Sequence, residues 1–513
     1  MKKIFITFIL VLFLGVYSCS EDFTVNPKIN VEELETYFLE EENVETAIIG
    51  IYDLMQYNYG RDWHSAFLVK LLPGDDANAA GGNSEDQSQL QSIDDFDNVS
   101  SSNVSIASVW DIFYRTISLS NLVIENIKDS NLSNKDKALA EAKFMRAWSY
   151  MELTTMFGDI PLRLTVPGSA EEFGIAKSSR ADIYTQIQLD LTDAIASLPE
   201  KNALADNFRV SKGTAQALMG KVLVFQEKYS EAIPYFQSVI SNTAHDLEAN
   251  PGDVWSINNE FGKESLFEIG YVSTTARDWG NIAWGGRNES NLHIQLMGPR
   301  GDGIFDLTGT GLINGWGFNL PTSKLATAFD TAGDVTRKAA TLMTEAELIA
   351  AGGAVDASAA TGGVIWDYEG AIRIKYATKS EDTSADGVRE LNYSTNFRLF
   401  RYAEVLLLAA EAYNKAGGQD AAARTELNKV RVRAGLLPDN TSTGNVLFEA
   451  IVNEKYLELA HEGQRFWDLV RWGKASTELA GTGYTSTNDL FPIPITEIDK
   501  NSELTIGDQN PGY

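Results

Sequence analysis

The sequence predicts a mainly α protein: a tetratricopeptide-repeat helical array with a loop-rich insertion that carries short strands. Two observations support this class. Apolar residues recur at helical spacing on both sides of the insertion. The insertion itself, residues 246–386, is rich in Gly, Asn, Thr and aromatic residues, has strand-like pieces at 266–272 and 364–366, and lacks long amphipathic helices apart from 344–351.

The N-terminus has the pattern of an export signal. Two lysines precede an apolar run over residues 4–16, which is too short for a membrane-spanning helix. Cys19, the only cysteine, follows this run, and residues 16–19, Val-Tyr-Ser-Cys, resemble a bacterial lipobox, whose cysteine is acylated. Residues 20–22, Ser-Glu-Asp, resemble the acidic tag of lipoproteins on the outer face of the outer membrane. We therefore expect a lipid anchor at Cys19; the alternative is a plain signal peptide with a free cysteine nearby.

A first helix is predicted over residues 44–55, whose apolar side chains share one face. The next segment, 57–108, is dominated by Gly, Asn, Asp and Ser, so we expect a long loop that is functional or disordered. Its acidic residues raise the alternative of a calcium site, but the ligand order of an EF-hand is absent.

Five further helices are predicted before the insertion. They cover residues 108–127, 133–156, 183–198, 212–226 and 229–240. Glycine and proline in the segment 157–162, Phe-Gly-Asp-Ile-Pro-Leu, end the second of them. Asn121 and Arg146 lie inside these helices, and we expect them to bond the backbone and a carboxylate, respectively.

Two helix pairs have tetratricopeptide-type spacing, in which small residues let paired helices approach closely. In the 212–240 hairpin the small, large, small and aromatic positions are Gly220, Leu223, Ala232 and Phe236. A second pair surrounds the turn at 415–418, which is a residue longer than the consensus. Because such units bury their faces by stacking, we expect the separated pairs to join into one array.

The insertion carries the main candidate binding residues. Its aromatic and polar side chains lie among glycines, which cannot cover them, so we expect at least one exposed ring. An exposed tryptophan beside Asn, Asp and Arg suits a sugar, whose ring stacks on the indole while its hydroxyls form hydrogen bonds. The alternative is that these rings fill the core beneath long loops. The candidates are Trp279, Trp284, Arg287, Asn288, Trp316 and Phe318.

Residues 453–472 are predicted to form one amphipathic helix in which acidic and basic side chains alternate with aromatic ones. Carboxylates beside arginines are compatible with a general acid and base. Arginine partners hold carboxylates ionised, however, which favours structural ion pairs. Arg398, Arg401 and Arg433 are expected to be structural for the same reason, rather than to steer an acidic substrate.

Residues 458–474, Glu-Leu-Ala-His-Glu-Gly-Gln-Arg-Phe-Trp-Asp-Leu-Val-Arg-Trp-Gly-Lys, resemble the C-terminal signature of the SusD/RagB family of outer-membrane nutrient-binding lipoproteins. Further blocks follow in the family's order, at 110–126, 141–148, 396–407, 427–436 and 490–494. The resemblance implies a helical protein with tetratricopeptide-type pairs that caps a TonB-dependent transporter of the SusC type. It also implies that the loop after the first helix helps to line the ligand site, which adds Asp75, Asp76, Asn78 and Phe96 to the candidates.

The expected organisation follows from these assignments. It comprises a lipoprotein signal peptide (1–18), an N-terminal helical region with the tetratricopeptide hairpin (19–245), the loop-rich ligand-binding insertion (246–386) and a C-terminal helical region (387–513).

The charge of the chain and the motifs it lacks argue against nucleic-acid binding and against catalysis. Acidic residues number 71 against 42 basic ones, a formal charge of −29, and no basic cluster is present, so nucleic acid is excluded as a partner. No serine elbow, phosphate loop, zinc pair or dinucleotide fingerprint stands in a fitting context, so we expect no enzyme, cofactor or metal site. A glycosidase stays open as an alternative, because sequence cannot exclude two carboxylates that face each other across a cleft.

The resemblance therefore implies a cell-surface, lipid-anchored protein that captures an oligosaccharide or polysaccharide and delivers it to a SusC-like TonB-dependent outer-membrane transporter. Two alternatives remain: a peptide-binding, RagB-like importer component, and a tetratricopeptide assembly scaffold without a small ligand.

Overall fold

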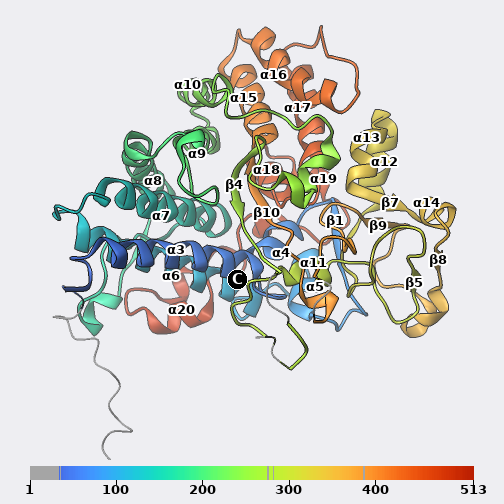
Figure 1. Cartoon of the computed structure of the whole chain (residues 1–513), viewed down its shortest axis with the longest axis horizontal. Helices are drawn as coiled ribbons and strands as arrows, with labels where there is room; N and C mark the ends of the chain where they lie inside the picture. The colour runs from blue at the N-terminus through green and yellow to red at the C-terminus, as the bar shows by residue number, and fades with distance from the viewer. Residues whose placement is uncertain (1–33, 35, 274–276, 281, 283, 385–386) are drawn as a thin grey trace, which may run out of the picture.

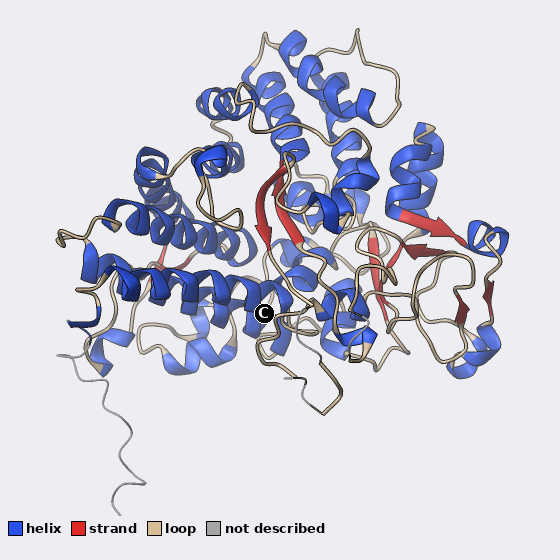
Figure 2. Cartoon of the chain, viewed as in Figure 1, coloured by secondary structure: helices blue, strands red, loops and turns tan. Residues whose placement is uncertain are grey.

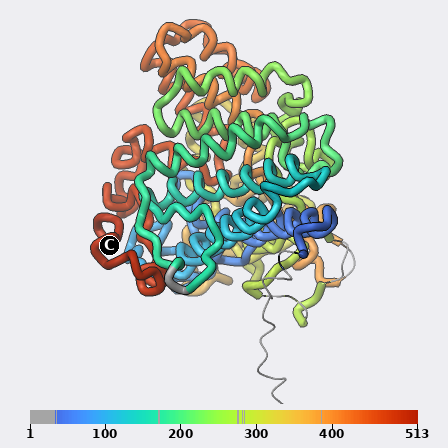
Figure 3. Tube along the Cα trace, turned by 90° about the vertical axis from the view of Figure 1, so that its left-hand side faces the viewer, coloured from blue at the N-terminus to red at the C-terminus, as the bar shows by residue number. Residues whose placement is uncertain are grey.

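Helices form most of the computed structural model, which describes residues 34, 36–273, 277–280, 282, 284–384 and 387–513. Cys19 and the expected signal peptide lie outside the described residues. Six helices form the N-terminal part of the array: α3 (Glu41–Gly60), α6 (Val104–Ile127), α7 (Lys135–Phe157), α8 (Arg180–Ser197), α9 (Lys212–Phe225) and α10 (Tyr229–Ile240). Each packs on the next in this order, and Figure 3 shows them as successive layers.

The α9–α10 hairpin confirms the tetratricopeptide-type spacing. Gly220 on α9 faces the ring of Phe236 on α10 so closely that a Cβ atom at residue 220 would lie 2.4 Å from Phe236 Cε1. The small residues at the contact, Gly220 on α9 and Ala232 on α10, are both buried. A residue without a side chain is therefore what allows these helices to pack at this separation.

The second predicted pair also forms and joins the first. It consists of α15 (Tyr402–Ala416) and α16 (Asp420–Arg433), followed by α17 (Gly444–Glu458). Helix α10 packs on α15, so residues on opposite sides of the insertion continue one array (Figure 1). The remaining helices are short: α4 (Ala66–Leu71), α5 (Ser88–Asp94), α11 (Leu292–Leu296), α12 (Ser323–Ala332), α13 (Val335–Thr341), α14 (Glu345–Ala350), α18 (Arg465–Arg471), α19 (Ala475–Glu478) and α20 (Ile495–Lys500).

Among the described residues the strands form five two-stranded antiparallel pairs (Figure 2). These are β1 (Ala77–Ala80) with β6 (Phe318–Pro321), β4 (Ser265–Ile269) with β10 (Phe397–Arg401), β2 (Ile160–Pro161) with β3 (Lys177–Ser178), β5 (Phe305–Asp306) with β8 (Ala354–Val355), and β7 (Leu342–Thr344) with β9 (Ala371–Arg373). The β1–β6 pair matters for the site, because it joins the segment after α3 to the insertion.

Three predictions of local structure were wrong. Segment 57–108 is not one long loop, since α4, β1 and α5 form within it. The insertion contains α11, α12 and α13 as well as the predicted α14, and the strand predicted at 364–366 does not form; the strand that follows this segment is β9, at 371–373. The predicted helix 453–472 is broken between α17 and α18.

The break between α17 and α18 has a tertiary cause. His461 and Gly463 have φ angles of 61° and 73°, in the left-handed region that ends a helix. The His461 N–H donates to Asp76 Oδ2 over 2.6 Å. Glu462 lies in the same turn and pairs with Arg401 and Lys375 over 2.7 and 2.9 Å. These long-range partners hold the turn although the helical periodicity continues through it.

Buried ion pairs confirm the structural interpretation of the arginines. Arg401 contacts Glu264 and Glu458 over 2.8 and 2.6 Å, and all three side chains are almost fully buried. Burial alone would raise the pKa of Glu458, but the guanidinium groups of Arg433 and Arg401 outweigh burial and hold that pKa well below its ordinary value. Glu458 therefore stays ionised and is not suited to act as a general acid.

Arg146 and Asn121 also have the structural roles expected from the sequence. Arg146 binds Asp190 through Nε and Nη2 over 2.8 and 2.6 Å, and donates from Nη1 to Asn121 Oδ1 over 2.8 Å. Asn121 Nδ2 in turn donates to the carbonyl of Arg163 over 3.1 Å. Helices α6, α7 and α8 are thus joined by one buried polar network.

Candidate functional site

Four tryptophans from three separate segments meet at the surface, and we name them the tryptophan platform: Trp63, Trp279, Trp284 and Trp316. Trp63 lies between α3 and α4, Trp279 and Trp284 lie on the loop between β4 and α11, and Trp316 precedes β6.

The rings of the platform are stacked or tilted against one another. Trp63 stacks on Trp284 with centroids 5.7 Å apart and on Trp316 with centroids 5.8 Å apart, at interplanar angles of 15° and 17°. Trp316 also contacts Trp284 at 5.9 Å and Trp279 at 6.1 Å. Trp316 is therefore the ring that contacts all three others.

Exposure separates the outer rings from the supporting ones. Trp279 and Trp284 are 52% and 48% exposed, whereas Trp63 and Trp316 are half-buried. Phe318 is buried at 2% exposure, with its ring edge-to-face against Trp63 at 6.4 Å. Large exposed indoles supported by further rings form an apolar surface with a fixed shape.

Helix α3 holds the loop that carries the exposed tryptophans. The Gly285 N–H donates to Asp62 Oδ2 over 2.7 Å, and the Tyr57 hydroxyl donates to the Gly285 carbonyl over 2.8 Å. Arg287 forms an ion pair with Asp53 on α3. The backbone next to Trp284 is thus bonded on both sides, which limits the movement of its ring.

Trp316 is positioned through its backbone. Arg300 Nη1 donates to the Trp316 carbonyl over 3.1 Å. The same guanidinium pairs with Asp86 at 3.5 Å and Asp302 at 3.2 Å. Through Arg300, segment 81–86, which follows β1, therefore also supports the platform.

The six candidates from the insertion fall into two groups. The structure brings Trp279, Trp284 and Trp316 together at the surface, with Phe318 buried beneath them. Arg287 is exposed and engaged with Asp53, and Asn288 accepts a hydrogen bond from Arg277 Nη1 over 3.0 Å. Arg287 and Asn288 thus position the loop, and their contact with a ligand stays a prediction.

The four candidates from segment 57–108 form contacts within the protein, and two of them, Asp75 and Asp76, are buried. Asp75 binds Arg465 and Lys324 over 2.7 and 2.6 Å. The two cations outweigh burial and lower its pKa. Asp76 is 1% exposed, and burial raises its pKa to about 6. These two carboxylates hold the turn between α17 and α18, and their contact with a ligand stays a prediction.

Asn78 and Phe96 are also engaged within the protein. Asn78 Nδ2 donates to Glu369 Oε1 over 2.9 Å and to the Asp367 carbonyl over 3.1 Å. The Phe96 ring packs on Phe466 and Tyr484 with centroids 5.7 and 5.5 Å apart. The structure therefore does not bring either residue to the platform.

Sequence reasoning missed Trp63. This residue lies in the same glycine-, asparagine- and aspartate-rich segment that was singled out for ligand binding, directly after Arg61 and Asp62. The criterion that selected the insertion, an aromatic residue flanked by Asp and Arg in a loop, would have found it.

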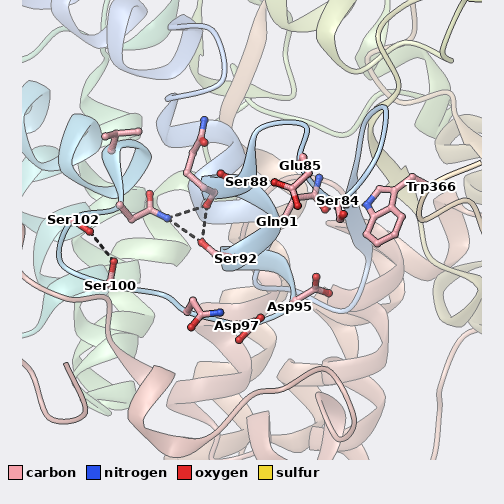
Figure 4. Close-up of a pocket in the computed structure, with 14 residues that line it drawn as sticks. Ser84, Glu85, Ser88, Gln91, Ser92, Asp95, Asp97, Ser100, Ser102 and Trp366 are labelled. Atoms are coloured by element: carbon pink, nitrogen blue, oxygen red, sulfur yellow. Dashed lines mark hydrogen bonds between the residues drawn. The ribbon is translucent and has the colours of Figure 1, made fainter. Parts of the chain in front are cut away.

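Apart from the platform, a cavity of about 620 Å³ lies beside α5 and is lined mainly by hydroxyl, amide and carboxylate groups (Figure 4). Trp366 is the aromatic residue at its edge, and its Nε1 donates to Gln91 Oε1 over 3.0 Å. One half-buried ring offers far less apolar contact than the platform. The platform is therefore the main candidate site.

The part of the chain that the structure describes lacks two features of other classes of protein. No group of three or more His, Cys, Asp or Glu side chains in this part of the chain is arranged to hold a metal ion. No described helix has both the length and the apolar character needed to cross a bilayer.

The fold and the platform define a class: a helical-array binding protein with an exposed aromatic surface. Comparison with known families identifies the family. The model of the SusD family matches residues 263–489, and the model described as "Starch-binding associating with outer membrane" matches residues 25–224. This chain belongs to the SusD family.

Individual relatives are similar to this chain over all or nearly all of its length. The SusD-like protein P2 of Formosa agariphila is 30% identical, with 100% of each chain covered. The solved structure of a laminarin-binding SusD-like protein superposes with a TM-score of 0.81 at 30% identity, covering 92% of this chain and 100% of that one. Surface glycan-binding protein A from Bacteroides thetaiotaomicron superposes with a TM-score of 0.78 at 25% identity, covering 93% and 100%.

Proposed function

We propose that this protein captures a neutral polysaccharide or oligosaccharide on the tryptophan platform. The observation that carries the proposal is the meeting of four indoles from three distant segments, two of them about half exposed. The C–H faces of sugar rings stack on such indoles. The similar solved structure is named for laminarin binding, which makes laminarin the ligand to test first.

Binding without chemistry is sufficient for this role. The carboxylates in the charged C-terminal segment and its partners, of which Glu458 and Asp75 are examples, are buried in ion pairs with arginines inside the protein. Asp53 and Asp86, which lie nearer the platform, are paired with Arg287 and Arg300. We infer that the ligand leaves the platform unchanged.

We further propose that the protein is lipid-anchored at Cys19 on the cell surface and delivers its ligand to a SusC-like TonB-dependent transporter. The family description includes association with the outer membrane, and the sequence around Cys19 resembles a lipobox. Mass spectrometry of the mature N-terminus tests the anchor: an acylated Cys19 supports it, and an unmodified cysteine refutes it.

Calorimetric titration with laminarin tests the binding function. The triple variant Trp279→Ala, Trp284→Ala and Trp316→Ala should lose binding, while its circular dichroism spectrum stays helical. Trp366→Ala is the matched control, since it removes a half-buried indole outside the platform, and should bind like the wild type. Undiminished affinity in the triple variant would reject the site, and binding of peptides in place of glycans would favour the RagB-like alternative.

A further inference from the structure

A groove of about 600 Å³ adjoins the tryptophan platform along α3. It lies between the middle of α3, the residues at and after the end of β4, and the connection between α8 and α9. The proposed function uses only the platform and leaves this groove without a role.

Contacts made by α3 connect the groove to the loop that carries the two exposed tryptophans of the platform. Asp53 lines the groove and also pairs with Arg287. One helical turn further, Tyr57 bonds the backbone carbonyl next to Trp284. With a rise of 1.5 Å per residue, Asp53 and Tyr57 are about 6 Å apart along α3.

The loop that carries the exposed tryptophans rises from the rim of the groove. The Val272 N–H donates to the Glu289 carbonyl over 2.7 Å and closes the base of this loop. Both residues line the groove, and Trp279 and Trp284 lie between them in the chain. A linear ligand that leaves the platform along α3 therefore enters the groove.

The groove offers the same kinds of group as the platform. Tyr52 and Phe208 meet edge-to-face with centroids 5.4 Å apart, and both are half-buried. The amides of Gln56 and Asn207 lie beside these rings along the groove. Aromatic rings next to amides suit the apolar faces and the hydroxyls of a sugar.

Charge restricts the kind of glycan. Glu260, Glu268 and Glu289 line the groove. Buried Arg398 lies 3.6 Å from Glu260 and 3.7 Å from Glu268, and burial raises the pKa of Glu260 to about 7, so this carboxyl is partly ionised near neutral pH. Glu289 is exposed and adds a further negative charge. A uronate or sulfated sugar would meet like charge here.

We propose that this groove binds the continuation of a neutral glycan chain whose first sugars stack on the tryptophan platform. The proposal rests on the proposed function and extends it: the groove makes affinity depend on chain length and rejects anionic glycans.

The test is calorimetric titration of the full chain with laminari-oligosaccharides of increasing length. The wild type should bind longer oligosaccharides more tightly. Phe208→Ala should keep the wild-type affinity for the shortest ligands and lose about fivefold to tenfold for the longest. Phe173→Ala is the matched control, because Phe173 is exposed outside the groove and has a guanidinium 6.0 Å from its ring, as Phe208 has at 5.2 Å.

A second variant covers the case in which Phe208→Ala does not fold. Ile49→Arg lies on the exposed face of α3 at the edge of the groove, where a long side chain obstructs it without entering the core. It should give the same length-dependent loss.

Three results would overturn the proposal while leaving the proposed function intact: wild-type affinity that does not rise with length, groove variants that match the wild type at every length, or equal losses at all lengths. Sulfated or uronate glycans that bind as tightly as laminarin would refute the charge argument. A wild type that binds no glycan would instead refute the proposed function, and this inference with it.

Discussion

Trp316→Ala is the single substitution expected to weaken glycan binding most. Trp316 contacts Trp63, Trp284 and Trp279 with centroids 5.8, 5.9 and 6.1 Å away. These contacts are present with and without ligand, so they affect binding by fixing the other rings in place, each by at most about 0.5–1.5 kcal/mol, the contribution of an aromatic pair. Because neighbouring rings do not add fully, we expect the loss of this positioning together with the Trp316 ring itself to weaken binding by about 1.5–3 kcal/mol, a factor of about 10 to 150 in Kd.

Isothermal titration with laminarin measures this loss, and thermal unfolding of the same samples monitors the fold. Because Trp316 is half-buried, the variant should remain folded with a lowered Tm. Trp316→Phe keeps a ring at this position and should recover part of the affinity. A Trp316→Ala protein whose Kd stays within about twofold of the wild type would show that the interlocked rings do not form the binding surface.

Three further predictions concern stability. Gly220→Leu should destabilise the protein by about 2–3 kcal/mol, measured by urea unfolding, because its Cβ would lie 2.4 Å from the Phe236 ring. Lys455→Ala should cost about 1–3 kcal/mol in the same assay, since buried Asp468 loses the Lys455 Nζ at 2.6 Å but keeps Arg471 at 2.8 Å. Asp76→Asn should flatten the pH dependence of stability: burial raises the folded-state pKa of Asp76 to about 6, above its unfolded value, so the wild type loses up to about 3 kcal/mol relative to this variant as pH rises from about 4 to about 6.

Each stability prediction has a control or a contradicting result. Gly252→Ala places a Cβ at an ordinary 3.6 Å from Ala340 and should change the free energy of unfolding little, unlike Gly220→Leu. Lys455→Met keeps the apolar stem but not the charge, so stability equal to the wild type would contradict the ion-pair argument. Parallel pH profiles of the wild type and Asp76→Asn would contradict the raised pKa.

The helical array could be predicted from the sequence because helix packing depends on the spacing of apolar and small residues within a short stretch of chain. Gly220 and Phe236 are spaced for close contact within one hairpin, and the apolar stripe of each long helix is visible in a short window. No such local pattern marks the turn between α17 and α18. Helical periodicity continues through it, and the partners that stabilise it, Asp76 and Arg401, are distant in the chain.

The site was predictable only in part for the same reason. Glycine-rich surroundings indicated that Trp279, Trp284 and Trp316 would not all be covered, which the exposure of the first two confirms. Trp63 meets these rings where the end of α3 contacts the loop, through the hydrogen bond from Tyr57 to the Gly285 carbonyl, and these residues are far apart in the sequence. The sequence also could not show that Asp75 pairs with Arg465, because this contact is equally non-local.

Fluorine NMR of the 5-fluorotryptophan-labelled protein, titrated with laminarin, would show whether a glycan contacts the tryptophan platform. With resonances assigned by single substitutions, the account predicts that the signals of Trp279, Trp284 and Trp316 shift or broaden on binding, while those of buried Trp148 and of Trp366 at the polar cavity stay in place. Binding that leaves the platform signals unchanged, or that moves only the Trp366 signal, would contradict it.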